Sequence, residues 1–564
     1  MKPIIDKYIW ILVVIFLFYA SVHIYLYSIN SKFHTIDAPN HALFCLEFYR
    51  DLGSTLKNPN LDLTSKLKKC YTYFREGIIY WPKFVYLTSI PPMFLFGPSI
   101  NSIKYANLLY VFILMLYTYL LVCELTGDKM NSLFISSAVL LFPVIFEAVQ
   151  GYGLDFPLTA LTVIFYYYLI KTDLFTKLNY SIYTGLILGI SFLVKGQISI
   201  FIFSSVVWIA LRGMIKSLKD KDIEKFFWML VNICIFVVLS YGIASIWWNN
   251  KFSDIWISFK EHTISNTKYL ESHPLEEYKS LSYYGFYLKY LFKEGIGPIL
   301  FGIILFLNIL FYLRKDFKNK FVYFLWLVIP LIAFSFLFQV KQLRFVMPVV
   351  PAMVICAGSI FAHGRRWKYM GWSIIMGVLF IQLVHPPFII RQPFNQLFSQ
   401  KINIRQWKSG ALNKKIVQAC VNSLGKELSP GRYKVIIFKY LPLPDGPVAF
   451  QFWIELLGYK KGYYFYTHDF VDQAYSVYYW LKDRTEDDKF LFVFLDKGYV
   501  RFEEFFTRDI ILSRMQGLVP WIQEYENNDA FLEMIEVLLP NIKKNLKYIS
   551  EFQYLDYKGE VYRL

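Results

Sequence analysis

The hydropathy pattern of the chain is a series of long apolar segments separated by short polar ones. About eleven stretches of roughly 17–22 residues carry few charges, and this length matches the hydrocarbon thickness of a bilayer. The first stretch is longer than a typical signal-peptide core and no small-x-small site follows it, so we expect it to be retained. The predicted spans are 8–29, 102–125, 131–148, 154–170, 181–194, 196–212, 227–248, 296–313, 321–338, 345–362 and 369–386.

Lys and Arg are distributed unevenly between the loops that join these spans. With the N-terminus inside, most of the short-loop cations fall in 126–130, 171–180, 212–226, 314–320 and 363–368. The short loops then assigned outside, 149–153 and 339–344, hold only Lys341 and Arg344. This positive-inside bias predicts a multi-pass protein of the plasma (inner) membrane with a cytoplasmic N-terminus.

Two of the outside loops, 30–101 and 249–295, are long. The first contains a helical-looking piece over 40–56, with Asp37 as a plausible N-cap and Pro39 in the first turn. It also contains an apolar run over 84–97 that Pro91 and Pro92 interrupt. We expect this broken run to lie along the membrane edge, since it is too short to span easily.

The pattern changes after the last apolar segment, which divides the chain into a membrane part, 1–390, and a second part, 391–564. The second part is charged and contains short β-like runs. Residues 434–438 and 490–494 are buried-strand candidates, and 472–481 is a helix candidate. We therefore expect a small extracytoplasmic α/β domain. No Gly-rich nucleotide-binding motif occurs in it.

Composition agrees with a membrane protein. The chain has 564 residues, of which 56% are hydrophobic and 18% charged, with a formal net charge of +17. A soluble protein of this size would carry more charge. Excess basic residues can indicate nucleic-acid binding. Here they lie mainly in loops between apolar segments, so we expect membrane lipids as partners and no nucleic acid.

Several polar residues are predicted at the outer membrane boundary. The carboxylates are Asp37, where the chain leaves the first span, and Asp155, at the start of the fourth. The cations and histidines are His41, Lys83, Lys195, His262, Lys268, Lys341 and Arg344. Charges at this depth usually mark a pathway or a site. Carboxylates combined with several cations suit a lipid phosphate held by Lys and Arg, and an acceptor deprotonated by Asp.

A purely structural role is the alternative for several of these residues. Asp37 and Asp155 are each in a position to start a helix. Lys195, Lys341 and Arg344 are placed to reach lipid head groups from helix ends. The histidines do not have metal-ligand spacing, so no metal site is predicted, although a divalent metal ion is left open as a cofactor.

Five segments also resemble the polytopic GT-C glycosyltransferases, in particular the branch of protein O-mannosyltransferases and the aminoarabinose transferases that modify lipid A. The resemblance covers about residues 1–390. The most specific piece is the Gly-rich helix ending in Lys-Gly, Gly185 to Gly196. The others are Asp37 just after the first helix, the run 80–86 with the ending Leu95-Phe96-Gly97, Leu141-Phe142-Pro143 followed by Gly153-Leu154-Asp155, and the segment 344–351.

Three features depart from that family. The second acid that often stands beside the first-loop Asp is replaced by Ala38, which argues against a true protein O-mannosyltransferase. The segment from about 51 to 75 is an unusual insertion. Lys83 occupies the second Pro position of the family's Pro-Pro-Leu-Tyr-Tyr stretch.

The resemblance implies an inverting glycosyltransferase with a polyprenyl-phosphate-sugar donor. A hexose or pentose would pass to an acceptor hydroxyl or phosphate on a lipid, glycan or protein at the outer face. Asp37 would be the general base, and Asp155 would orient the sugar or a basic partner. Lys195 and Arg344, then Lys268 and Lys341, would hold the phosphate.

Three other classes are left open. A glycan ligase or polymerase with a lipid-diphosphate donor would release a diphosphate lipid. A lipid or sugar transporter would place charges near the midplane and show inverted repeats. A non-enzymatic scaffold would tolerate loss of the boundary Asp and its cations.

Overall fold

The computed structural model describes residues 7–29, 38–75, 82–249, 281–338, 341–363 and 365–384, and in the C-terminal part 412–424, 428, 431–439, 455–457, 460, 463–469, 489–497, 547–554 and 557–563. The chain divides into two compact units. One consists of Met1–Asn30 and Phe48–Lys408, and the other of Ser31–Glu47 and Ser409–Leu564. The boundary between Glu47 and Phe48 means that the described residues 38–47 group with the C-terminal part.

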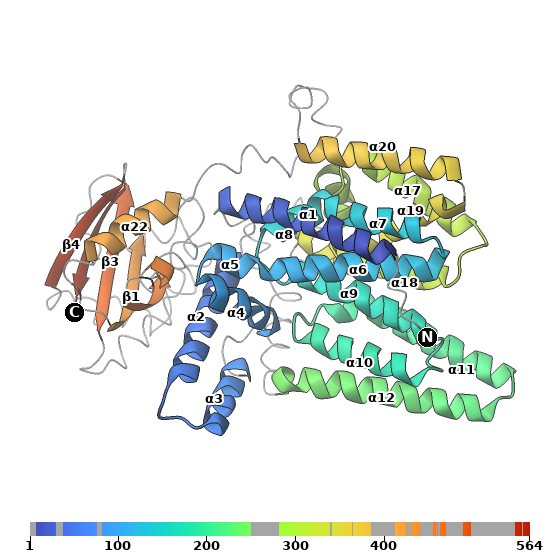
Figure 1. Cartoon of the computed structure of the whole chain (residues 1–564), viewed down its shortest axis with the longest axis horizontal. Coiled ribbons are helices and arrows are strands. Elements are labelled where there is room, and N and C mark those ends of the chain that lie inside the picture. Colours follow the sequence, from blue (N-terminus) through green and yellow to red (C-terminus); the bar gives the residue numbers. More distant parts are fainter. Residues whose placement is uncertain are drawn as a thin grey trace. The chain divides into compact units, whose positions relative to one another are not determined.

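Helices make up most of the described chain (Figure 1). In the first half they are α1 (Lys7–Ile29), α2 (Ala38–Lys57), α3 (Leu63–Arg75), α4 (Phe84–Phe96), α5 (Ile100–Lys104), α6 (Ala106–Thr126), α7 (Lys129–Leu141), α8 (Pro143–Gln150), α9 (Asp155–Lys171), α10 (Leu178–Phe192), α11 (Ile198–Lys219) and α12 (Ile223–Trp248). The next are α15 (Leu281–Tyr284), α16 (Phe286–Tyr290), the π-helical turn η1 (Leu291–Gly295), α17 (Pro298–Leu313), α18 (Lys320–Phe336), the 3₁₀ turn η2 (Leu343–Val346), α19 (Val349–Ser359), the 3₁₀ turn η3 (Ile360–His363), α20 (Arg365–Val384) and α22 (Leu412–Leu424).

Each of the eleven predicted spans overlaps one to three of these helical elements. Among the described residues, four helical segments are long and apolar enough to cross a membrane alone: Lys7–Ser28, Ile100–Thr126, Ile198–Lys219 and Ile223–Trp248. The number is six if each of two bent helix pairs counts as one span. One of these pairs is α7 with α8, which are bent by 62°. Further apolar helices are shorter, and they include Leu178–Phe192, Lys320–Phe336 and Val349–Ala362. The bend after α7 occurs where Pro143 begins α8.

Two expectations for the first long loop can be compared with these helices. Residues 40–56 are helical within α2, with Pro39 in its first turn, whereas the proposed cap Asp37 lies outside the described residues. The predicted break at Pro91 and Pro92 was wrong, because α4 runs through both prolines. Each proline lacks only one backbone donor, and the φ that its ring fixes is close to the helical value.

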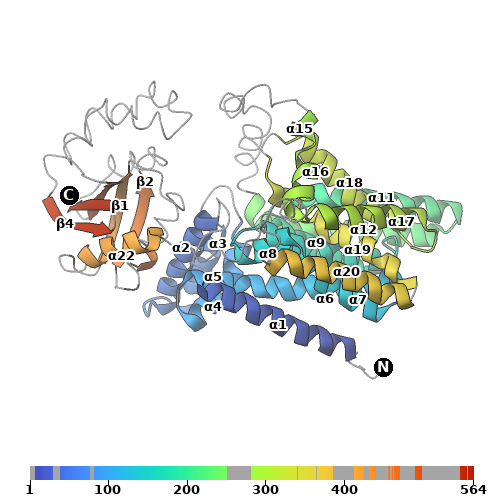
Figure 2. The same ribbon diagram turned by 90° about the horizontal axis from the view of Figure 1, so that it is seen from above.

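Buried polar side chains in the first unit bind backbone carbonyls of neighbouring helices. α1 lies beside α6 and α7 (Figures 1 and 2). Tyr19 and Tyr27 of α1 donate to the carbonyls of Leu140 at 2.8 Å and Val149 at 2.7 Å. Such bonds suit an apolar surrounding, where an unsatisfied polar group costs several kcal/mol.

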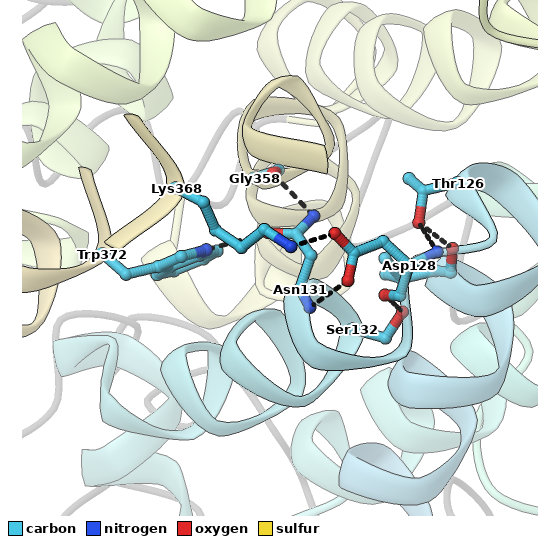
Figure 3. A network of polar contacts seen from close by, with 8 residues as sticks. Thr126, Asp128, Asn131, Ser132, Gly358, Lys368 and Trp372 are labelled. Carbon is cyan, nitrogen blue, oxygen red and sulfur yellow. Dashed lines mark hydrogen bonds and ion pairs between the residues drawn. The ribbon is translucent and has the colours of Figure 1, made fainter. Parts of the chain in front are cut away.

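The helices α7, α19 and α20 meet in a polar network (Figure 3). The Asn131 side chain donates to the Gly358 carbonyl at 3.1 Å and accepts from the Trp372 indole N–H at 2.8 Å. Asp128 caps α7, since one carboxylate oxygen accepts from the Asn131 backbone N–H at 3.0 Å. Its other oxygen accepts from Lys368. The network joins two of the loops that are predicted to lie inside.

The C-terminal part contains a five-stranded sheet in the order β2-β1-β3-β5-β4. The strands are β1 (Gly431–Lys439), β2 (Tyr463–Asp469), β3 (Phe490–Lys497), β4 (Lys547–Tyr554) and β5 (Tyr557–Arg563). β1 pairs parallel with β2 and β3, and β5 pairs antiparallel with β3 and β4. α22 lies against the sheet at β4 and β5 (Figure 1).

The two predicted strands are confirmed as β1 and β3, neighbours inside this sheet. Their side chains Ile436 and Phe492 are fully buried, as expected for strands with apolar residues on both faces. The helix predicted over 472–481 lies outside the described residues.

Candidate functional site

The Gly-rich motif Gly185 to Gly196 brings α10 into close contact with α12. An added Cβ at Gly185 would lie 2.8 Å from the Phe236 carbonyl oxygen, and one at Gly189 would lie 2.6 Å from Ile243 Cβ. Small residues permit close helix approach of this kind in membranes. The Ser240 hydroxyl donates to the Gly185 carbonyl at 3.2 Å, which joins the two helices further.

The end of this motif presents Lys195. α10 ends at Phe192, whose carbonyl accepts from the Trp248 indole N–H at 3.1 Å. An added Cβ at Gly196 would lie 2.6 Å from the Trp248 ring, so a side chain there would displace the ring. The turn between α10 and α11 is thereby held on α12, and Lys195 projects from that turn.

Asp155 is the first residue of α9. Its position in the first helical turn favours a carboxylate, because backbone N–H groups and the helix dipole are positive there. The turn before it is fixed by Asn107, whose amide donates to the carbonyls of Val149 at 3.0 Å and Gly151 at 2.8 Å. Asp155 is 6% exposed.

Arg344 is part of the 3₁₀ turn η2, directly before α19. The motif 344–351 contains Pro348 and Pro351 at the start of α19. The missing N–H of proline costs little there, because the first N–H groups of a helix have no intrahelical acceptor. The Trp326 indole N–H donates to the Pro348 carbonyl at 3.0 Å, and this bond fixes the turn on α18.

These three side chains meet, although they lie far apart in sequence. The Lys195 Nζ is 2.6 Å from Asp155 Oδ1, and the Arg344 Nε is 3.7 Å from Asp155 Oδ2. Their side chains are 11%, 17% and 8% exposed for Lys195, Arg344 and Asp155. Both cations also lie against the Phe345 ring, at 4.9 Å for Lys195 Nζ and 5.5 Å for Arg344 Cζ. We call Asp155, Lys195 and Arg344 the charged triad.

The sequence did not single out Phe345 or Tyr287. Tyr287 is fully buried in α16, and its hydroxyl accepts from the Gln342 backbone N–H at 3.4 Å. Its ring packs on Phe334 with centroids 6.1 Å apart. Nothing in the hydropathy pattern marks Tyr287 as the residue whose hydroxyl binds the loop before Arg344.

Lys341 has partners at the end of α18. Its ammonium donates to the carbonyls of Phe334 at 2.6 Å and Ser335 at 2.7 Å, and it lies 4.6 Å from the Tyr283 ring centroid. A cation is favourable at the negative end of a helix. Burial nevertheless lowers the pKa of Lys341 to about 8.

The other predicted site residues have partners outside the triad, belong to the second unit or lie outside the described residues. Lys83 precedes α4, donates to the Tyr73 carbonyl and lies 5.3 Å from the Phe48 ring centroid. His41 is buried in α2, in the part that belongs to the second unit. Asp37, His262 and Lys268 lie outside the described residues.

Metal ligands do not gather in the described part of the chain. Within it, no group of three or more His, Cys, Asp or Glu side chains is arranged to hold a metal ion. The triad itself offers one carboxylate and two cations, and this set suits an anion better than a metal ion.

Comparisons with known proteins agree with the motifs. Residues 84–242 match the family described as dolichyl-phosphate-mannose-protein mannosyltransferase. The fold is similar to that of ArnT from Cupriavidus metallidurans in the apo state, with a TM-score of 0.53 and 12% identity over 97% of both chains. The same protein bound to undecaprenyl phosphate gives a TM-score of 0.52, with the same identity and coverage. No curated protein matches the chain by sequence.

These similarities confirm the predicted fold class, a polytopic helical membrane protein of the GT-C type. The family match over residues 84–242 agrees with the predicted resemblance to the GT-C membrane glycosyltransferases. The family match includes the Gly-rich motif, Asp155 and Lys195, and it ends before Arg344.

Proposed function

We propose that the chain transfers a sugar from a polyprenyl-phosphate donor to an acceptor hydroxyl or phosphate at the outer face of the membrane. The observation that carries this proposal is the charged triad, in which Lys195 and Arg344 converge on Asp155 beside the ends of apolar helices. Lys and Arg held in this way bind phosphate oxygens by charge-assisted hydrogen bonds. ArnT with bound undecaprenyl phosphate has the same fold, which supports a lipid phosphate as the ligand.

Within this proposal Asp155 is a positioning residue. Its two oxygens face two different cations, so it holds Lys195 and Arg344 in one geometry before the donor arrives. Preorganised cations need no rearrangement when charge develops on the leaving phosphate. The assignment favours the orienting role predicted for Asp155 over a direct role in proton transfer.

The proton acceptor in the proposal is Asp37. The acceptor oxygen attacks the anomeric carbon, the bond from that carbon to the phosphate oxygen breaks, and the acceptor proton passes to the Asp37 carboxylate. Polyprenyl phosphate leaves with the bonding electrons, stabilised by Lys195 and Arg344. A single displacement inverts the anomeric configuration. Lys268 and His262 remain candidates for donor contacts, and Lys83, Lys341 and His41 for supporting ones.

The orientation belongs to the same proposal. The distribution of Lys and Arg favours an N-terminus in the cytoplasm and a triad on the outer side of the plasma (inner) membrane. The C-terminal domain, proposed to follow residue 390, is then extracytoplasmic. A lipid-borne donor suits a site on the outer face, because the lipid carries the sugar there within the bilayer.

Mass spectrometry of the lipid products tests the proposal. Purified protein in nanodiscs is incubated with a panel of polyprenyl-phosphate sugars, with polyprenyl-diphosphate glycans in parallel, in the presence of membrane extract as a source of acceptors. The proposal predicts release of polyprenyl monophosphate and glycosylation of an acceptor. Release of a polyprenyl diphosphate instead would identify a ligase or polymerase. Movement of intact donor between leaflets without cleavage would identify a transporter.

A further inference from the structure

Helix α3 lies in the insertion over about 51–75, which departs from the pattern of the GT-C family that the chain resembles. The helix exposes an apolar face. Leu63, Leu67 and Tyr71 lie four residues apart, so they share one side of the helix. They are 73%, 61% and 50% exposed, and no residue of α3 is buried. Helices on the surface of a soluble domain normally turn such a face toward the core.

Cations flank this face. Between Leu63 and Arg75 the chain carries Lys66, Lys68, Lys69 and Arg75 and no carboxylate. At about 100° per residue, Lys66 lies at one border of the apolar face and Lys68 and Arg75 at the other, whereas Lys69 lies opposite Leu67. An apolar face bordered by cations is the pattern of a helix that lies in the plane of a membrane interface.

The surroundings of α3 belong to the membrane part of the chain. α3 is in the same compact unit as the apolar helices and contacts α12, which is long and apolar enough to cross a membrane (Figure 1). The carbonyl of Tyr73 near its end accepts from Lys83, which precedes α4. α4 exposes Leu95 and Phe96 by 77% and 68%. The compact unit that contains α3 thus exposes apolar side chains at the end of α4 as well.

We infer that α3 is an interfacial helix that binds an anionic lipid surface. Leu63, Leu67 and Tyr71 enter the boundary between head groups and acyl chains, and the lysines contact lipid phosphates. Charge complementarity selects an anionic bilayer, since α3 brings four cations and no acid. In the orientation proposed above this is the outer leaflet.

Site-specific photo-crosslinking in nanodiscs tests this inference on the full-length protein. A photo-crosslinking amino acid replaces Leu67 in one variant and Lys69 in another, which lies about 200° away on the same helix. Nanodiscs contain phosphatidylcholine with or without phosphatidylglycerol, and the adducts are identified by mass spectrometry. We expect lipid adducts at position 67 in at least roughly tenfold excess over position 69. The excess should be largest in the anionic nanodiscs.

A charge variant provides the second arm. In K66Q/K68Q/K69Q the crosslinker at position 67 should lose most of its phosphatidylglycerol adducts, with thermal unfolding unchanged because these side chains are not buried. Equal lipid labelling at positions 67 and 69 would overturn the inference. Adducts to another polypeptide, or no lipid adducts at position 67, would also overturn it and would assign the face to a protein partner or to solvent.

Discussion

Asp155 gathers two cations that come from segments 40 and 189 residues further along the chain. The apolar pattern placed Asp155, Lys195 and Arg344 at ends of predicted spans, and therefore on one side of the membrane. That both cations contact one carboxylate depends on how α9, α10 and η2 pack, and no local pattern contains that information. For the same reason the sequence grouped Lys341 with the phosphate ligands, whereas the structure places it on the carbonyls at the end of α18.

Asp155→Asn should destabilise the protein, because it leaves Lys195 and Arg344 buried without their shared carboxylate. Breaking a buried ion pair by removing one partner costs roughly 3–5 kcal/mol. The free energy of unfolding in detergent measures the change. Lys171→Met is a matched control, since Lys171 forms a 2.8 Å ion pair with Glu124 in which the side chains are 25% and 41% exposed.

The control Lys171→Met should lower the free energy of unfolding by no more than about 1 kcal/mol. Asp155→Asn combined with Lys195→Met should be less unstable than the sum of the two single changes, because the two side chains form an ion pair that each single change already removes. Additive losses, or a loss at Asp155 no greater than that at Lys171, would contradict the triad.

Lys341 should lose its proton at a lower pH than an ordinary lysine. Burial lowers its pKa from 10.5 to about 8 in the folded protein. Below pH 8 the ammonium is charged in both states, and its burial opposes folding. Between about pH 8 and 10.5 the unfolded state binds more protons, so the contribution of Lys341 to stability rises with pH.

The rate of acylation of Lys341 against pH, followed by peptide mass spectrometry, measures this titration. Half-maximal reactivity is expected near pH 8, compared with about 10.4 for lysine in a reference peptide. Coincident curves for Lys341 and the peptide would refute the assignment.

Among the secondary-structure elements, the sequence predicted the positions of most helices and of two strands. Long apolar stretches became helices, and the two apolar runs of the C-terminal part became the paired strands β1 and β3. The failure at α4 arose because two adjacent prolines were taken as a break, although both fit inside that helix. The sequence could not say which helix the glycines of α10 face, because partner choice depends on the whole unit.

Gly189→Ala should separate α10 from α12. The added Cβ would lie 2.6 Å from Ile243 Cβ, so one helix must shift. Overpacking of this kind costs about 1–3 kcal/mol, and we expect lowered transfer because the turn with Lys195 follows α10. Gly242→Ala is the matched control on α12, where nothing lies within 4 Å of the added Cβ.

Thermal unfolding and transfer rate are measured for both variants. Gly242→Ala should leave stability unchanged or raise it slightly, since Ala is the better helix former. Equal effects of the two substitutions would show that close packing of α10 on α12 does not determine stability.

At the scale of the whole molecule, the alternation of spans and the bias of Lys and Arg predicted a multi-pass membrane protein, which the fold similarity confirms. The grouping of residues 31–47 with the C-terminal part was not predictable, since it joins segments more than 350 residues apart. Local hydropathy describes each segment's preference for lipid or water, and it contains nothing about such long-range association.

The proposed orientation predicts which cysteines an impermeant maleimide reaches in intact cells. Lys68 on α3 should be outside, and Lys216 at the end of α11 should be inside; both side chains are exposed. Lys68→Cys should be labelled in intact cells and Lys216→Cys only after permeabilisation, with peptide mass spectrometry separating both from native cysteines. The reverse pattern would invert the topology and place the triad on the cytoplasmic side.

The most direct test of the central claim compares wild type with Asp37→Asn in release of polyprenyl phosphate from a polyprenyl-phosphate sugar. The amide keeps the shape of the carboxylate but cannot take the acceptor proton. We expect release by wild type, a loss of at least about 10²-fold in the variant because general-base catalysis is removed, and unchanged thermal unfolding. Transfer by a folded Asp37→Asn variant at the wild-type rate would contradict Asp37 as the base.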